Sequence, residues 1–234
     1  MTDAIDPTRS LGALVRDNLA YAAVFESVGL DYCCGGDTTL EAACEAEGID
    51  LDDLRERLAG VEEAPDGDDW ETHAELIADI VSTHHQYLRE ELPSLEGLVR
   101  KVARVHDENH PELRELRSEY LALAEEMKRH IDEEETDLFP IVETLDRGES
   151  LTDAQRATLG NEIAELEADH AETANRLERL AALTDGYAVP DDACASYEAM
   201  LERLERLETG THRHVHKENN VLFAEVERQL PASA

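Results

Sequence analysis

Four stretches of the chain place apolar residues at alternating steps of three and four, the spacing that puts them on one face of an α-helix. These stretches cover residues 77–95, 116–138, 163–180 and 204–221. No two-residue alternation of the β-strand kind competes with them. Aromatic residues make up only 4% of the chain, and Glu, Leu, Ala and Arg dominate the long runs, as is typical of helical proteins. The pattern predicts an all-α protein with a four-helix bundle.

Local signals predict where the bundle helices begin and end. Gly148 should stop the second helix, and Thr152-x-x-Gln155 forms a capping box for the third. Gly186 should end that third helix. Pro190 stands where a fourth helix would start.

The N-terminal region predicts shorter helices. One is expected over Ser10–Val28, and Thr38-x-x-Glu41 would cap the next. Asp50 can cap a third helix that runs to about Leu58.

An acidic, polar stretch with one Pro and one Gly follows these short helices, at residues 62–69. At 234 residues the chain is long enough for two domains with a real core. We therefore predict a small N-terminal helical domain at residues 1–62, a linker at 63–70 and the bundle at 71–234.

A cassette of His, Glu, Leu and Phe at fixed spacing occurs twice. Within each copy the imidazole and the carboxylate lie on one helical face, about 6 Å apart along the axis. Both can therefore reach one buried centre. The copies are His130-x-x-x-Glu134-x-x-x-Leu138-Phe139 and His214-x-x-x-Glu218-x-x-x-Leu222-Phe223.

Another histidine precedes each cassette at a similar distance, so the repeat includes a further helix in each half. The copies are separated by 84 residues, and the preceding histidines, His85 and His170, by 85. One histidine in a core stripe is usually a satisfied core residue. Six such polar side chains in apolar stripes favour a metal centre, because bundle cores build metal sites from inward-facing Glu and His. The candidate ligands are His85, His130, Glu134, His170, His214 and Glu218.

Mixed imidazole and carboxylate ligands suit Fe, Mn or Zn and do not suit a soft metal that prefers thiolate ligands, such as Cu(I). Six protein ligands exceed the usual four of zinc. Two ions that share two bridging carboxylates, each with two terminal histidines, would leave positions open for water, oxo or a diatomic molecule. We expect two iron ions.

Two further histidines, His84 and His106, are possible ligands. His84 adjoins His85, but its counterpart in the repeat is Asp169, so we expect His84 to be exposed or a neighbour of the site. On one continuous helix His106 would lie about 31 Å from His85, too far to share a centre. Neither is assigned as a ligand, and whether either enters the metal shell stays open.

Two more histidines flank the second cassette. His212 and His216 each lie two residues from His214, which turns them about 200° around a helix. We expect both on the surface.

The N-terminal region contains the adjacent thiols of Cys33-Cys34-Gly35-Gly36. Such thiols in a turn near a helix N-terminus suit lowered thiol pKa values and redox or thiol chemistry, and a disulfide between them would be strained and labile. The simpler interpretation is two small residues in a turn. Cys44 and Cys194 are expected to be packed thiols within helices.

The chain resembles the Repair of Iron Centers family over nearly its whole length. Such proteins join a cysteine-bearing N-terminal domain to a hemerythrin-like bundle with a di-iron centre. The resemblance implies that the four histidines are terminal ligands and the two glutamates bridge, with an oxo bridge expected as well. The motifs that carry it are Asp31 to Gly36, His85, Leu92-Pro93, Val105-His106, His130 to Pro140, Asp169-His170 and His214 to Phe223.

This resemblance implies repair of iron–sulfur clusters damaged by nitric oxide or peroxide. The centre would supply or manage iron, Cys33 and Cys34 would act as thiols, and damaged iron–sulfur proteins would be the clients. One alternative is a module that binds or senses oxygen or nitric oxide, and another is a nitric oxide reductase or peroxide-consuming enzyme. A pure oxygen carrier or sensor would not need the dithiol.

The net charge of the chain limits its possible partners and its cellular environment. The chain has 56 acidic and 21 basic residues, a net charge of −35, which makes nucleic acid an improbable partner. That much self-repulsion suggests a cytosol of high salt, as in salt-loving organisms. With no signal peptide and no membrane-spanning apolar run, we expect a cytoplasmic protein. The oligomeric state is left open, a homodimer included.

Overall fold

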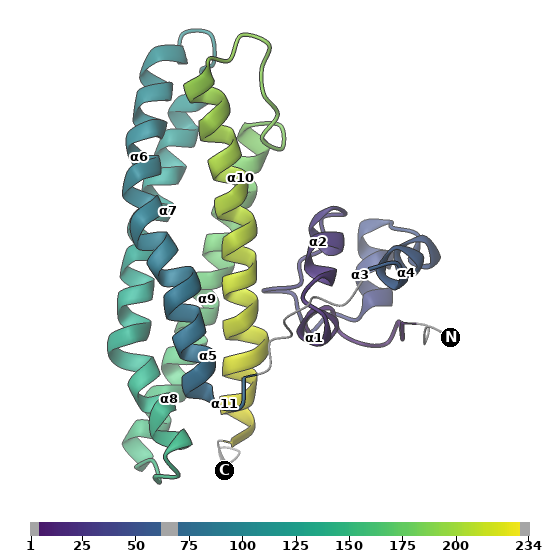
Figure 1. Cartoon of the computed structure of the whole chain (residues 1–234), viewed down its shortest axis with the longest axis vertical. Coiled ribbons are helices and arrows are strands. Elements are labelled where there is room, and N and C mark those ends of the chain that lie inside the picture. The colour runs from purple at the N-terminus through teal and green to yellow at the C-terminus, as the bar shows by residue number, and fades with distance from the viewer. Residues whose placement is uncertain (1–4, 62–69, 230–234) are drawn as a thin grey trace. The chain divides into compact units, whose positions relative to one another are not determined.

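The computed structural model describes residues 5–61 and 70–229, and these are helical with connecting turns (Figure 1). No strand occurs in these two ranges, so the all-α prediction is confirmed. Contacts divide the chain into two compact units, one holding residues up to Glu71 together with those from His212 onward, the other Thr72–Thr211. The predicted linker lies outside the described residues except for Trp70, and the predicted domain boundaries stay predictions.

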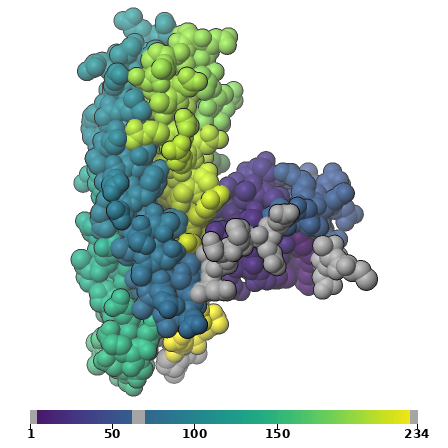
Figure 2. All heavy atoms as spheres, in the orientation of Figure 1, coloured from purple at the N-terminus to yellow at the C-terminus, as the bar shows by residue number. Residues whose placement is uncertain are grey.

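The unit from Thr72 to Thr211 is dominated by long helices. Figure 1 shows α6, α7, α9 and α10 running side by side, and Figure 2 shows side chains closing the space between α6 and α10 on the face in view. No helix in the described part of the chain is both long and apolar enough to cross a membrane. The elements are α5 (His73–Asp79), η1 (Ile80–His85), α6 (Gln86–His106), α7 (Leu113–Glu133), η2 (Glu134–Leu138), α8 (Phe139–Asp146), α9 (Asp153–Leu183) and α10 (Ala195–His216), the last of which continues into the other unit.

The core of this unit is the set of apolar stripes seen in the sequence. Leu92, Leu116, Leu180 and Met200, one from each long helix, are fully buried in one cluster. Their burial removes apolar surface from water, which is the main force that holds such helices together. Tyr120 lies in the same cluster, and its hydroxyl donates a hydrogen bond of 2.8 Å to the carbonyl of Leu92.

Most predicted helix ends of the bundle are confirmed. Thr152 and Gln155 form the capping box at the start of α9. Gly148 and Gly186 follow the ends of α8 and α9 with φ of 68°, a left-handed conformation that glycine adopts at no steric cost. The prediction at Pro190 is wrong, because the chain first makes a turn and α10 begins only at Ala195.

Three helices widen into π-helical segments beside the candidate ligands. The segment η1 ends at His85, η2 begins at Glu134, and η3 (Lys217–Phe223) contains Glu218. By contrast, α9 stays α-helical around His170. π-Helical turns are rare and frequently occur at functional sites, because the extra residue re-aims the side chains of that turn. The bundle backbone is therefore locally adapted where the cassettes lie.

The other unit combines short N-terminal helices with the end of the chain. Its core buries Phe25, Leu40, Leu58 and, from the end of α10, Val215. Its helices are α1 (Leu11–Asp17), α2 (Tyr21–Glu26), α3 (Leu40–Glu47), α4 (Leu51–Ala59), the residues of α10 from His212, η3 and α11 (Ala224–Gln229).

Two N-terminal predictions need correction. The helix expected over Ser10–Val28 is two helices, because the side chain of Asn18 accepts a hydrogen bond from the backbone of Ala20 and ends α1 there. The cap of α3 is Thr39 and not Thr38. Asp50 caps α4 as predicted.

Replacing Tyr120 with Phe tests the buried hydrogen bond of the bundle core. The change leaves the carbonyl of Leu92 without its side-chain donor and should lower the free energy of unfolding by about 1 kcal/mol. Denaturant unfolding in high salt measures it. Tyr87→Phe is the matched control, because that hydroxyl is buried with no hydrogen-bond partner among the residues described. Equal losses in the two variants would contradict the role of the bond.

Candidate metal centre

Three polar side chains converge in the unit from Thr72 to Thr211. His85 ends η1, His130 lies in the last turn of α7, and Glu134 begins η2. The Glu134 carboxylate places Oε2 3.3 Å from Nε2 of His85 and Oε1 3.2 Å from Nε2 of His130. All three side chains are buried, with Glu134 at 0% exposure. Each carboxylate oxygen therefore faces a different imidazole.

His170 joins them from α9. Its Nε2 lies 2.9 Å from Nε2 of His130, and the ring centroids are 4.6 Å apart. Two imidazole nitrogens at this distance repel each other unless a proton or a cation is shared between them. Both rings are buried, so water does not screen the repulsion. The contact therefore requires either one N–H proton or a cation between the two nitrogens.

The second cassette pairs its own residues in the other unit. Nε2 of His214 lies 2.7 Å from Oε1 of Glu218, and both side chains are fully buried. In the first cassette the corresponding distance, from His130 to Glu134, is 3.2 Å. Both copies thus turn the imidazole Nε2 toward the carboxylate four residues on.

The structure brings all six predicted side chains into two groups whose ligand atoms lie within 4.8 Å of one another. Both groups contain Glu134 and Glu218, so the carboxylates are shared while each group has its own pair of histidines. The groups are His85, Glu134, His214, Glu218 and His130, Glu134, His170, Glu218.

This donor set fits a pair of metal ions. Two fully buried carboxylates are costly in a protein interior unless cations compensate them. Imidazole nitrogens with carboxylate oxygens suit Fe, Mn or Zn, and carboxylates common to both groups suit bridging of two ions. The residues present therefore suit a dimetal site.

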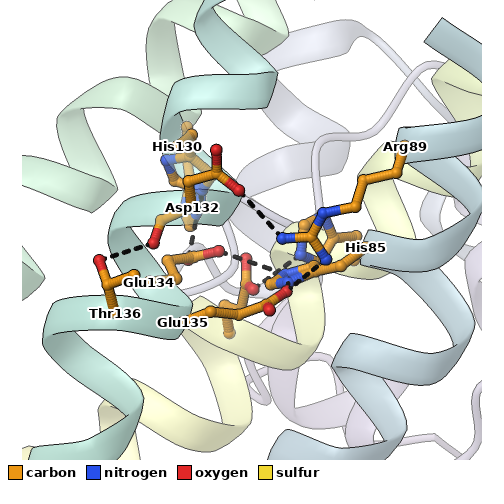
Figure 3. Close-up of polar contacts among 10 residues, drawn as sticks. His85, Arg89, His130, Asp132, Glu134, Glu135 and Thr136 are labelled. Carbon is orange, nitrogen blue, oxygen red and sulfur yellow. Dashed lines mark hydrogen bonds and ion pairs between the residues drawn. The ribbon is translucent and has the colours of Figure 1, made fainter.

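Glu135 supports His85 from outside the group, a role that the sequence did not predict (Figure 3). Its Oε1 lies 2.7 Å from Nδ1 of His85 and accepts a hydrogen bond of 2.8 Å from Arg89, which also binds Asp132. Burial raises the pKa of Glu135, but the hydrogen bonds from Arg89 and His85 outweigh it and lower the pKa. A carboxylate on Nδ1 fixes the ring so that Nε2 points at Glu134. Arg89 lies one turn after His85, and this spacing is the one signal for it in the sequence.

Two predicted surface histidines are not exposed. His216 is 1% exposed, and burial lowers its pKa to about 4. Its ring packs edge-on against Tyr32 within the same unit, at 5.6 Å between centroids. His212 is half-buried, and burial lowers its pKa as well. The prediction that both lie on the surface is therefore wrong, because the N-terminal residue Tyr32 packs against this segment.

The other histidines lie outside the two groups. His84 is buried, so it is not one of the exposed histidines. His106 belongs to neither group; its Nε2 lies 3.2 Å from Sγ of Cys194. The expectation that Cys194 is packed in a helix is wrong, because it is exposed and precedes α10. Cys44 is buried in α3 as predicted.

Cys33 and Cys34 lie in a turn organised by Asp31. Oδ1 of Asp31 accepts hydrogen bonds from the backbone N–H of Cys33 and of Cys34, and Oδ2 accepts one from Gly35. The two Sγ atoms are 3.8 Å apart, with no disulfide between them. The hydrogen bond with Cys34, burial and nearby Asp31 all raise the pKa of Cys33, so the predicted lowering is wrong for this thiol.

This turn is held by the π-helical segment η3 of the same unit. Nδ2 of Asn220 donates to the carbonyls of Tyr32, at 3.3 Å, and Cys33, at 2.9 Å, and Asn219 donates to Cys33 at 3.3 Å. Gly36 faces the side chain of Asn220 so closely that a Cβ there would collide with it. The glycine of the Cys-Cys-Gly-Gly motif thus makes room for the asparagine that anchors the turn.

Removing the support of His85 should weaken metal binding. Arg89→Ala frees Glu135 from its guanidinium partner, and loss of such outer partners lowers metal affinity about 10- to 100-fold. Competition with a chelator, followed by metal analysis, measures the change. Arg100→Ala, which removes an exposed pair with Glu96 on the same helix, is the control and should bind as wild type. Equal affinity in the Arg89 variant would exclude this role.

A methyl group at Gly36 should displace the anchor of the turn. The backbone of Gly36 does not have positive φ, so the collision with Asn220 decides the effect. We expect Gly36→Ala to destabilise the protein by about 1–3 kcal/mol. Gly97→Ala is the control: its Cβ meets nothing within 4 Å inside α6, and alanine should stabilise that helix by about 1 kcal/mol. Thermal unfolding of the pair compares them, and a neutral Gly36 variant would contradict the packing.

Comparisons with known proteins agree with this architecture. Residues 76–226 match the family described as "Hemerythrin HHE cation binding domain", and residues 7–62 match the ScdA_N domain, whose description is a domain of unknown function. A protein of Staphylococcus haemolyticus named iron-sulfur cluster repair protein ScdA is 34% identical over 216 residues, covering 90% of this chain and 94% of that protein. Iron-sulfur cluster repair protein YtfE of Yersinia pseudotuberculosis is 33% identical over 218 residues, covering 92% and 95%.

The matches extend over both the cysteine-bearing region and the helices that carry the His/Glu groups. The resemblance seen in the sequence is therefore confirmed. With a hemerythrin-type pair of His/Glu groups and relatives matched nearly end to end, this chain belongs to the ScdA/YtfE family of iron–sulfur cluster repair proteins.

Proposed function

We propose that this protein repairs iron–sulfur clusters damaged by nitrosative or oxidative stress, and that a non-haem di-iron centre supplies the iron. The observation that carries the proposal is the pair of buried groups that share Glu134 and Glu218. Relatives that match over about nine tenths of the chain are named for iron–sulfur cluster repair.

The four histidines would each bind one ion through Nε2, the nitrogen that faces the other donors, and the two shared glutamates would bridge the ions. Iron bound by these donors would be available for release to a client or for binding a diatomic molecule. The protein's part is to hold the donors in place: Glu135 fixes the ring of His85, and His130 and His170 turn their Nε2 atoms toward each other. Burial of all six donors keeps water from competing for the ions.

Cys33 and Cys34 would contribute thiol chemistry to the repair. Cys34 is half-buried, so a damaged iron–sulfur client can reach this thiol, whereas Cys33 is buried. A module that only binds oxygen or nitric oxide has no use for such a dithiol. The anchored turn therefore favours repair over simple sensing or nitric oxide reduction.

Metal analysis with Mössbauer spectra tests the centre. Wild type purified without air and in high salt should hold about two iron ions per chain as a coupled pair, as in other histidine- and carboxylate-rich bundles. Glu134→Ala combined with Glu218→Ala should lose the pair, because both bridges are removed. Glu165→Gln removes an exposed carboxylate of α9 and should keep it. Zinc or no metal in the wild type would overturn the proposal.

A repair assay tests the function itself. An iron–sulfur enzyme inactivated by nitric oxide should regain activity when the iron-loaded protein is added, and the double glutamate variant should restore none. Cys33→Ser with Cys34→Ser should abolish repair and leave binding of nitric oxide at the bundle intact. Full repair by the serine variant would remove the thiols from the mechanism, and diatomic binding without any repair would leave the sensing function.

A further inference from the structure

A third group of ligand atoms lies apart from the two His/Glu groups. One carboxylate oxygen of Asp31 and the Sγ atoms of Cys33 and Cys34 lie within 4.8 Å of one another. We propose that these three residues form a further metal site, which takes a borderline divalent cation such as Fe²⁺ or Zn²⁺.

The spacing of the donors matches such an ion. Two thiolates bound to one tetrahedral ion at about 2.3 Å lie about 3.8 Å apart. The Sγ atoms of Cys33 and Cys34 are 3.8 Å apart. Sγ of Cys33 lies 3.2 Å from Oδ1 of Asp31, within about half an ångström of the sulfur–oxygen distance expected around the same ion. Little movement is needed to bring the three donors onto one cation.

The carboxylate is oriented before any ion arrives. Backbone N–H groups of Cys33 and Cys34 donate to Oδ1 of Asp31, and that of Gly35 donates to Oδ2. A carboxylate offers about two acceptor positions on each oxygen, so these bonds fill Oδ1 and leave one position of Oδ2 for a metal ion. Gly35 preserves the arrangement, because a Cβ there would lie 3.2 Å from Oδ2 of Asp31 and 3.0 Å from its carbonyl oxygen.

Binding would exchange protons for metal. Two S–H bonds break, two metal–sulfur bonds form, two protons are released to water, and no electron is transferred. Sγ of Cys33 lies next to both Asp31 and Cys34, the two residues that would share the cation with it. Because the cation must displace both thiol protons, metal affinity should fall as the pH is lowered.

The site has an open side and a fixed base. Asp31 is exposed and Cys34 is half-buried, so three protein donors leave a fourth position that an exchanging ligand can reach. The base is η3, whose Asn219 and Asn220 hold the carbonyl of Cys33 and directly follow Glu218 in the chain. A thiolate site connected to the segment that carries a bridging glutamate would bind iron transiently after it leaves the centre and before it reaches a client. In this respect the inference rests on the proposed function.

Cobalt titration of the full-length protein tests the site. The protein is used iron-loaded, reduced and without air, and Co²⁺ is the probe because thiolate ligation gives it near-ultraviolet charge-transfer absorption. Wild type should bind about one Co²⁺ with this signature and release about two protons. Cys33→Ser and Cys34→Ser should each abolish the signature, and Asp31→Asn should weaken binding about tenfold. Cys44→Ser and Cys194→Ser, which change thiols outside the group, should leave it unchanged.

A second measurement needs no variant, since Cys33 is buried and its replacement could unfold the turn. Zn²⁺ should protect Cys34 of the wild type from iodoacetamide, read by peptide mass spectrometry, while exposed Cys194 keeps its rate. Absence of the cobalt signature in wild type, its survival in both serine variants, or unchanged labelling of Cys34 would each overturn the site.

The same proteins separate this inference from the proposed function. Cobalt binding that depends on Cys33 and Cys34, together with cluster repair that ignores them, would support the metal site and remove it from repair. Repair that requires both thiols without any metal binding by them would overturn the inference and keep the proposed function.

Discussion

The rest of this structure depends on one constraint: the negative charge of two fully buried carboxylates must be compensated. An uncompensated carboxylate in a protein interior costs several kcal/mol, so Glu134 and Glu218 need positive charge nearby. Four imidazoles surround them in the two groups, but neutral imidazoles supply hydrogen bonds and no net charge. Metal ions held by these donors would supply that charge, and the apolar stripes of the sequence form the helices that carry the donors. The same helices that bury the core thus also bury the site.

The two copies of the cassette have the same geometry and different surroundings. Each pairs a histidine with the glutamate four residues on, and each glutamate lies in a π-helical segment. The residue after the glutamate differs: Glu135 in the first copy holds Nδ1 of His85, whereas Asn219 in the second holds the carbonyl of Cys33. Duplication therefore preserved the ligands while the next position diverged. One copy supports the centre and the other connects its segment to the dithiol turn.

Much of the fold was predictable because it follows from periodicity and capping. The apolar stripes, the capping box at Thr152 and the cap at Asp50 depend on interactions within a few residues, which sequence spacing reports directly. The six clustered side chains were found because repetition singled them out. Predictions failed where residues far apart in the sequence meet: His216 is buried and packs against Tyr32 of its own unit. The π-helical turns likewise have no distinct signature in a single chain, and the only signal for the Arg89–Glu135 support is the position of Arg89 one turn after His85.

The thiols show how a local sequence motif can give the wrong expectation for a thiol pKa. A Cys-Cys-Gly-Gly turn before a helix suggests lowered thiol pKa values, yet Asp31 places a carboxylate against the turn, and burial and the neighbouring thiol favour the protonated form of Cys33. A negative group beside two thiols opposes thiolate formation in the absence of a cation and assists it when one binds. The turn is therefore poorly suited to act as a free nucleophile and better suited to gain its thiolate character from a metal. On this interpretation the thiols of the N-terminal region would act as metal ligands, as the His/Glu groups of the bundle would.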